Sequence, residues 1–209
     1  MFSLMLGQYL LDNPALISGR DVLELGSGVG FLGILTSFLN PASITMTDFN
    51  SSVLQRLTLN VALNRHPSAP KPTISRWDWA NVTDAMIGAA NPSLILGADV
   101  TYDPEGIDLL VDLLARTFAL RKPNERRAMI ACTVRNSDTF SHFLNKLGIL
   151  LFKYIPFLNP LLDMSPGLNH SITNLSGDLT SLNLQESAKF YYEDTVSVVN
   201  LVLITPSKH

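Results

Sequence analysis

A glycine-rich turn near the start of the chain contains the first residues whose types and spacing suit ligand binding. An apolar run leads into a turn of small residues, and a helical pattern follows it. Glycines between a strand and a helix let backbone N–H groups approach a ligand without a Cβ in the way. The spacing from Gly28 to Gly33 also fits the G-x-G-x-x-G pattern of dinucleotide sites, so the turn alone leaves the ligand open. The residues that we expect to contact a cofactor here are Gly26, Ser27, Gly28 and Gly30.

Two acidic residues, each at the end of a predicted strand, narrow the choice of ligand. Glu24 lies two residues before the first glycine, where a negative charge suits an ammonium and a sulfonium better than a pyrophosphate. Asp48 follows the second predicted strand and is placed to accept the ribose hydroxyl protons of an adenosine. The alternatives are that Glu24 caps local N–H groups and that Asp48 caps a helix. Together the two carboxylates favour a cationic adenosine ligand.

The segment Trp77-Asp78-Trp79 follows the third predicted strand and carries groups that suit an adenine ring. At this edge of a doubly wound sheet an indole can cover the adenine face, and Asp78 can accept from the exocyclic amine. We assign Asp78 and Trp79 to the cofactor site and Trp77 to the core. The alternative is that both tryptophans only pack.

An aspartate and a tyrosine at the end of the fourth predicted strand suit an amine that accepts a methyl group. Asp99 lies at the carboxyl end of this strand and Tyr102 follows three residues later. Methyl transfer from a sulfonium to nitrogen is an in-line displacement, so the site must align a neutral amine and exclude water. Asp99 and Tyr102 are our catalytic candidates, and Ala98 is counted with the cofactor contacts. The alternative is that Asp99 caps the helix that begins near Pro104.

Strand and helix patterns alternate up to Gly148, as βαβ units require. They predict an α/β fold with a Rossmann-like, mostly parallel sheet and helices on both faces. The predicted strands are Val22–Leu25, Ser43–Thr47, Thr73–Arg76, Leu94–Ala98 and Ala128–Val134. The predicted helices are Phe31–Phe38, Ser51–Leu63, Pro104–Phe118 and Ser137–Leu147.

The pattern changes after Gly148. Apolar runs at Ile149–Phe157 and Val196–Thr205 predict two strands joined by a long loop at 159–187. A connector without a crossover helix favours an antiparallel pair. We therefore expect a seven-stranded sheet that ends in a C-terminal antiparallel hairpin.

The bulk composition indicates one globular domain. The chain has 209 residues, of which 46% are hydrophobic and 16% charged. A net charge of −3 offers no basic surface for direct nucleic-acid binding. The apolar start has no basic residue before it, and no apolar stretch is long enough for a membrane span, so we expect neither a signal peptide nor a membrane partner. The single cysteine, Cys132, is expected to pack inside, and we assign no metal ligands.

These motifs, in this order, resemble the seven-β-strand (class I) protein-lysine methyltransferases, and the resemblance covers about residues 3–150. It is nearest to the elongation factor 2 lysine methyltransferase branch. It implies S-adenosylmethionine as the cofactor, a lysine of elongation factor 2 as the acceptor, and a cytoplasmic location. Relatives carry a tryptophan-containing segment just upstream of Met1, so we expect this methyltransferase domain to lack an N-terminal segment. The matching stretches are Asp12-Asn13-Pro14, Glu24-Leu25-Gly26-Ser27-Gly28, Asp48, Asp78-Trp79, Ala98-Asp99-Val100 with Tyr102 and Pro104-Glu105, and Thr133-Val134-Arg135-Asn136.

Three other functions stay open at this point. A small-molecule methyltransferase would keep the cofactor, although no added substrate-capping domain is recognisable. A non-catalytic module that binds the cofactor or a partner is suggested by the expected lack of the upstream segment. A nicotinamide dehydrogenase fits the glycine spacing but needs an acid or base at the crevice, and the histidines fall in predicted loops, a helix or the terminus. These histidines are His66, His142, His170 and His209. The target lysine and the oligomeric state are not predicted.

Overall fold

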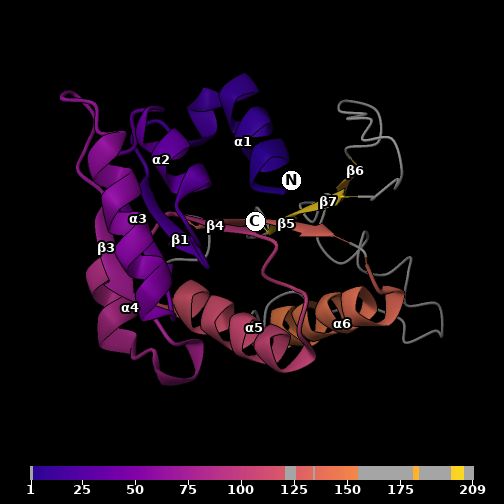
Figure 1. The fold of residues 1–209 in the computed structure, drawn as a ribbon. Helices are drawn as coiled ribbons and strands as arrows, with labels where there is room; N and C mark the ends of the chain where they lie inside the picture. Colours follow the sequence, from indigo (N-terminus) through magenta and orange to yellow (C-terminus); the bar gives the residue numbers. More distant parts are fainter. Residues whose placement is uncertain (1, 121–125, 134, 155–180, 184–198, 205–209) are drawn as a thin grey trace.

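A mixed β-sheet runs through the centre of the molecule (Figure 1). The computed structural model describes residues 2–120, 126–133, 135–154, 181–183 and 199–204. The strands are β1 (Asp21–Leu25), β2 (Ser43–Asp48), β3 (Thr73–Arg76), β4 (Leu94–Ala98), β5 (Arg127–Thr133), β6 (Ser181–Asn183) and β7 (Val199–Ile204). Their order across the sheet is β3-β2-β1-β4-β5-β7-β6.

The strands β3, β2, β1, β4 and β5 run parallel, which confirms the predicted Rossmann-like α/β fold. Leu25 at the end of β1 pairs with Thr47 of β2 and with Gly97 of β4, so the carboxyl ends of these strands meet at one edge. The strand order reverses between β1 and β4, and sheets of this type bind ligands outside the carboxyl ends at that point. The residues that directly follow these strands are therefore brought together by the fold.

Helices cover both faces of the sheet (Figure 1). Strand residues alternate between the faces, so Val22 packs towards one layer of helices and Leu23 towards the other. Cys132 of β5 is fully buried and packs with residues of α5 and α6, which confirms its predicted packing. The helices of the first layer are α1 (Phe2–Asp12), α2 (Phe31–Ser37) and α3 (Ser51–Leu63), and those of the second are α4 (Asp84–Ala90), α5 (Pro104–Ala119) and α6 (Ser137–Tyr154). Short 3-10 turns are η1 (Pro14–Leu16) and η2 (Trp79–Asn81).

Polar side chains fix the starts of the helices that follow the strands. Asn50 accepts from two N–H groups in the first turn of α3, at 2.9 and 3.3 Å. Asp103 caps α5 by accepting a backbone N–H three residues later, at 2.9 Å. The alternatives in which Asp48 and Asp99 serve as these caps are therefore wrong.

The chain after Gly148 differs from the prediction. Residues 149–154 are not a strand, because α6 continues through Gly148 to Tyr154. A glycine inside a helix costs only about 1 kcal/mol, and a short apolar run fits a buried helix as well as a strand. The hairpin predicted between Ile149–Phe157 and Val196–Thr205 is thus wrong in its first strand. The strand β7 pairs antiparallel with β5 and with β6, and β6 lies inside the stretch predicted as a loop, whose other residues are outside the described ones.

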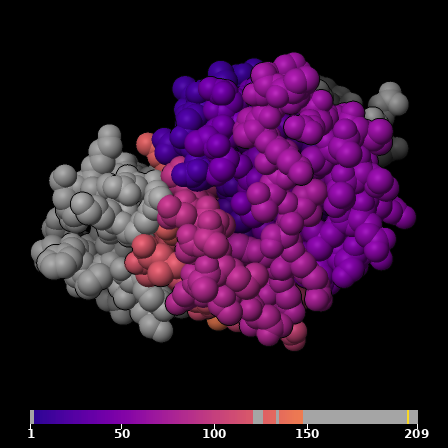
Figure 2. Space-filling model, turned by 90° about the vertical axis from the view of Figure 1, so that its left-hand side faces the viewer, coloured from indigo at the N-terminus to yellow at the C-terminus, as the bar shows by residue number. Residues whose placement is uncertain are grey.

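The first residues of the chain form a helix that the sequence analysis leaves unassigned. Leu6 and Leu10 of α1 are fully buried, and Gly7 brings the helix against Phe31 and Leu35 of α2. Figure 2 shows α1, in indigo, at the surface of the molecule. Within the described part of the chain, no helix has the length and apolar character that a membrane crossing needs.

Candidate functional site

The glycine turn forms as predicted between β1 and α2. Gly26, Gly28 and Gly30 have positive φ angles of 64°, 54° and 98°, a region that L side chains rarely adopt. A Cβ built on Gly30 would lie 2.3 Å from Leu57 Cδ1, whereas a Cβ on Gly28 would meet nothing within 4 Å. Gly30 therefore allows close packing on α3, and Gly28 is the glycine that borders open space. This is the backbone position that a ligand can approach.

Ser27 ties the turn to the neighbouring strand. Its backbone N–H donates to the Thr47 carbonyl at 2.8 Å, and its hydroxyl oxygen accepts from the Thr47 N–H at 3.0 Å. The side chain is buried. These bonds give Ser27 a role in shaping the turn, and direct contact with a cofactor stays a prediction.

Glu24 is buried beneath the turn. The residue is 3% exposed, and its Oε2 atom has no hydrogen-bond partner. Burial raises the pKa of this carboxyl to about 8, and the charge of Asp48 acts in the same direction, whereas the Ser27 hydroxyl and the Gly33 backbone oppose the shift. A buried oxygen without a partner in the protein is costly, and water, an ion or a functional role of the group usually explains it. Glu24 is thus suited to receive a positively charged group.

Asp48 reaches back from the end of β2 to the glycine turn. Its Oδ2 atom accepts the Gly28 N–H at 3.1 Å, and its Oδ1 atom accepts the Asn50 N–H at 2.9 Å. Each carboxylate oxygen keeps further lone pairs for other donors. The fold therefore brings Asp48, Gly28 and Glu24 together, and their contact with a cofactor stays a prediction.

The tryptophan segment divides between core and site. Trp77 is 3% exposed and belongs to the core, as predicted. Trp79 is half-buried, and its Cζ2 atom would lie 4.0 Å from a Cβ on Gly26, so the indole sits against the glycine turn. Asp78 accepts from the Ala80 N–H at 3.2 Å and from the Asn81 side chain at 2.8 Å. Asp78 thus starts η2, and its bond to an adenine amine stays a prediction.

The acceptor candidates lie at the end of β4. Asp99 adopts a left-handed backbone with φ 59° and donates its N–H to the Ala131 carbonyl of β5 at 2.9 Å. Tyr102 is 66% exposed and Ala98 is half-buried. The carboxylate of Asp99 accepts from Arg135 Nη2 at 3.0 Å. The structure thus places a carboxylate and an exposed phenol at the same edge as the glycine turn.

Arg135 is the residue of this region to which the sequence analysis gives no role. It follows the carboxyl end of β5, the strand beside β4. That position was the usable signal, because charged residues just past neighbouring parallel strands meet at one edge. Its partner could not be read from the sequence, since 36 residues separate the two side chains.

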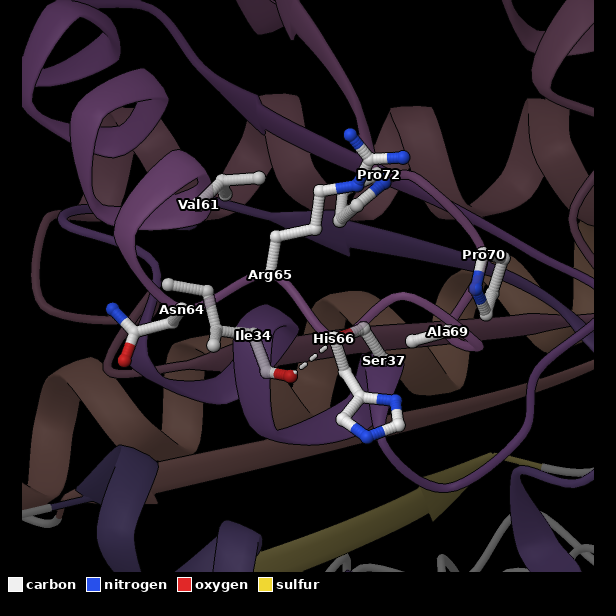
Figure 3. A pocket seen from close by; sticks show the side chains of 9 residues that line it. All are labelled: Ile34, Ser37, Val61, Asn64, Arg65, His66, Ala69, Pro70 and Pro72. Carbon is white, nitrogen blue, oxygen red and sulfur yellow. Dashed lines mark hydrogen bonds between the residues drawn. The ribbon is translucent and has the colours of Figure 1, made fainter.

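A separate pocket lies between the carboxyl-terminal ends of α2 and α3 (Figure 3). Its lining residues come from α2, α3 and the segment that follows α3, and none of the predicted site residues is among them. The Ser37 hydroxyl on its wall donates to the Ile34 carbonyl at 2.6 Å. The pocket is not part of the candidate site. No group of three or more metal-ligating side chains occurs among the residues that the structure describes.

The fold is Rossmann-like and is shared with solved methyltransferases. A TehB-like SAM-dependent methyltransferase from Corynebacterium glutamicum has a TM-score of 0.57 at 15% identity, over 96% of this chain and 88% of that chain. Magnesium protoporphyrin IX methyltransferase from Synechocystis, solved with bound SAM, has a TM-score of 0.55 at 12% identity, over 98% of this chain and 78% of that chain. At these identities the likeness concerns the fold alone.

Sequence comparison identifies the family. The lysine methyltransferase family matches residues 3–148, and the chain belongs to this family, as its motifs predict. The human protein named protein-lysine N-methyltransferase EEF2KMT is 34% identical over 157 residues, which cover 70% of this chain and 48% of that protein. The protein-lysine N-methyltransferase EFM3 of Chaetomium thermophilum is 29% identical over 160 residues, or 74% of this chain and 47% of that protein. The chain spans about half the length of the curated relatives it matches.

Proposed function

We propose that this chain is an S-adenosylmethionine-dependent protein-lysine N-methyltransferase that acts on elongation factor 2 in the cytoplasm. Family membership and the names of relatives such as human EEF2KMT support the proposal. The single observation that carries it is the unpartnered, buried carboxyl oxygen of Glu24 below a glycine turn that is open at Gly28.

The residues of the turn fit this cofactor. Glu24 supplies a negative charge for a cationic ligand, and Asp48 keeps lone pairs for ribose hydroxyl groups while it holds the Gly28 N–H. Trp79 lies against Gly26 and offers an aromatic face for adenine. Bound S-adenosylmethionine supplies an electrophilic methyl group on a positively charged sulfur. Gly26, Ser27, Gly30, Asp78 and Ala98 complete the proposed cofactor site.

Asp99 and Tyr102 are proposed to handle the acceptor. Lysine has an ordinary pKa of about 10.4, so its ammonium must lose a proton to solvent before the nitrogen can attack. The Asp99 carboxylate accepts an N–H of the amine and orients its lone pair, and the Tyr102 phenol forms the wall that excludes water. The enzyme's contribution is alignment and desolvation and not a covalent step of its own.

A labelled methyl donor tests the proposal. The 209-residue chain is incubated with purified elongation factor 2 and S-adenosylmethionine carrying a labelled methyl group, and the product is digested and sequenced. The expected result is label on a lysine of elongation factor 2. No incorporation, or label on a residue other than lysine, would contradict it. A thermal-shift comparison is expected to show stabilisation by S-adenosylmethionine and S-adenosylhomocysteine but not by NAD, which separates this function from a dehydrogenase.

A further inference from the structure

Asp99 is held from two sides by the neighbouring strand β5. Its backbone N–H bonds to the Ala131 carbonyl at 2.9 Å, and its Oδ2 atom accepts from Arg135 Nη2 at 3.0 Å. Its φ of 59° is unusual for a residue with a side chain and is kept only where the surroundings fix it. The carboxylate therefore has a fixed place and a fixed cationic neighbour.

The pair is open to solvent on the side of Arg135. The side chain of Arg135 is 59% exposed and that of Asp99 is 33% exposed. A carboxylate that accepts one bond from Arg135 still has lone pairs for the N–H of an amine. The geometry thus allows an acceptor amine to join the pair while the guanidinium stays beside it.

A carboxylate alone would be a poor partner for a lysine that has to react. An uncompensated negative charge within a few ångströms favours the ammonium form and raises the pKa of the amine, and the ammonium has no lone pair for attack. A guanidinium stays charged throughout the physiological pH range and cancels much of that effect. With Arg135 present, Asp99 can orient a neutral amine without stabilising the unreactive form.

We propose that Arg135 is a positioning residue that fixes Asp99 and, by its charge, keeps the acceptor lysine in the neutral, reactive form. This inference rests on the proposed function, since it needs a lysine acceptor at Asp99. It assigns a role to a residue that does not itself touch the reacting atoms.

The described ionisable groups that follow Asp99 or Arg135 in the sequence, and Cys132 on the neighbouring strand, do not supply this charge. Neither the Tyr102 phenol nor the Cys132 thiol can carry a positive charge, and burial raises the pKa of Cys132 to about 12. Asp103 is occupied by the Gly106 N–H, and Asp138 in the first turn of α6 is negative, as is Glu105 at the start of α5. Among the described groups near Asp99, Arg135 is therefore the source of positive charge.

The test compares the pH dependence of methyl transfer in matched variants. Single-turnover rates are measured between pH 6.5 and 9.5 with excess chain, S-adenosylmethionine and elongation factor 2, and folding is followed by circular dichroism at each pH. The variants are Arg135→Gln, Arg135→Lys and Lys146→Gln. Lys146 is the matched control, because it is also the half-exposed cation of a 3.0 Å pair, with Asp108, and its loss changes the net charge equally.

The Arg135→Gln variant is expected to move the acidic limb of the rate profile upward by about one pH unit. The Arg135→Lys variant keeps a positive charge beside Asp99, so its rate profile should lie close to that of the unmodified chain. The Lys146→Gln variant should leave the profile unchanged. The inference is overturned if the Arg135→Gln profile coincides with that of the unmodified chain, or if Lys146→Gln shifts it equally. If the unmodified chain transfers no methyl group at any pH, the proposed function fails and this inference fails with it.

Discussion

The backbone of α2 at Gly33 lies directly on the carboxylate of Glu24. A Cβ at Gly33 would come within 2.4 Å of Glu24 Oε2 and within 2.4 Å of Met46 Cε. The glycine is required here by the close approach of the helix and not by an unusual φ angle. This contact explains why the carboxylate of Glu24, next to the glycine turn, is shielded from water.

Gly33→Ala is expected to destabilise the protein and to weaken cofactor binding. The methyl group displaces either Glu24 or Met46, and overpacking of this kind costs about 1–3 kcal/mol of unfolding free energy. Urea denaturation measures the loss, and calorimetry with S-adenosylmethionine measures the change in affinity.

Gly88→Ala is the matched control for this substitution. A Cβ at Gly88, on the exposed side of α4, meets nothing within 4 Å. Alanine in a helix is favoured over glycine by up to about 1 kcal/mol, so this variant should be more stable than the unmodified chain. Equal effects of the two substitutions would contradict the packing at Gly33.

Glu24 should make the protein less stable as the pH rises. Its pKa is about 8 in the folded chain against an ordinary value of 4.5, so the folded state holds a proton that the unfolded state has lost between these values. The unfolding free energy then falls by up to about 1.4 kcal/mol per pH unit in this window. Below pH 4.5 both states are protonated and above pH 8 both are ionised, so the effect is constant outside it.

The Glu24→Gln variant isolates this contribution, because the amide does not titrate. Its stability relative to the unmodified chain should increase from pH 5 to pH 8 and then level off. Urea denaturation of both proteins at several pH values measures the difference. A difference that does not change with pH would mean that Glu24 is ionised in the folded protein.

Motifs formed by residues close together in the sequence could be predicted from it, and contacts between residues far apart in the sequence could not. The glycine turn follows local rules of turn formation, so its predicted position agrees with the structure. The same holds for α3, whose bounds are those predicted, because its apolar residues repeat at helical spacing. The contact between Asp99 and Arg135 depends on which strands are neighbours, and no local pattern contains it.

The errors lie where two structures suit one pattern. The run after Gly148 is apolar enough for a strand, but it extends a helix that already has Phe143 and Leu147 buried against the sheet. The helix α4 is short, with seven residues, and gives too few turns for a periodic signal. In both cases tertiary packing decides the outcome and local propensity does not.

Substitutions at Asp99 and Asp103 should distinguish a role in methyl transfer from a role in helix capping. Asp103→Ala removes the bond to the Gly106 N–H and should cost about 1 kcal/mol of stability. Asp99→Asn keeps a side chain that tolerates the left-handed backbone, so stability should change by less than about 0.5 kcal/mol. Methyl transfer should fall strongly in Asp99→Asn and little in Asp103→Ala. Denaturation and the labelled-donor assay measure the two properties, and the reverse pattern would show that Asp99 is structural.

Binding of S-adenosylmethionine should release a proton from Glu24. Near pH 7 the carboxyl is mostly protonated in the free protein, because burial holds its pKa at about 8, and a cationic ligand favours the ionised form. Affinity should therefore decrease by up to about tenfold for each pH unit below 8.

Calorimetry at pH 7 in phosphate and in Tris detects the released proton through the different ionisation enthalpies of the two buffers. The ligand's own amine titrates equally with Glu24→Gln, so the difference between the two proteins belongs to Glu24. If both proteins release the same number of protons, the carboxylate does not meet the ligand's positive charge.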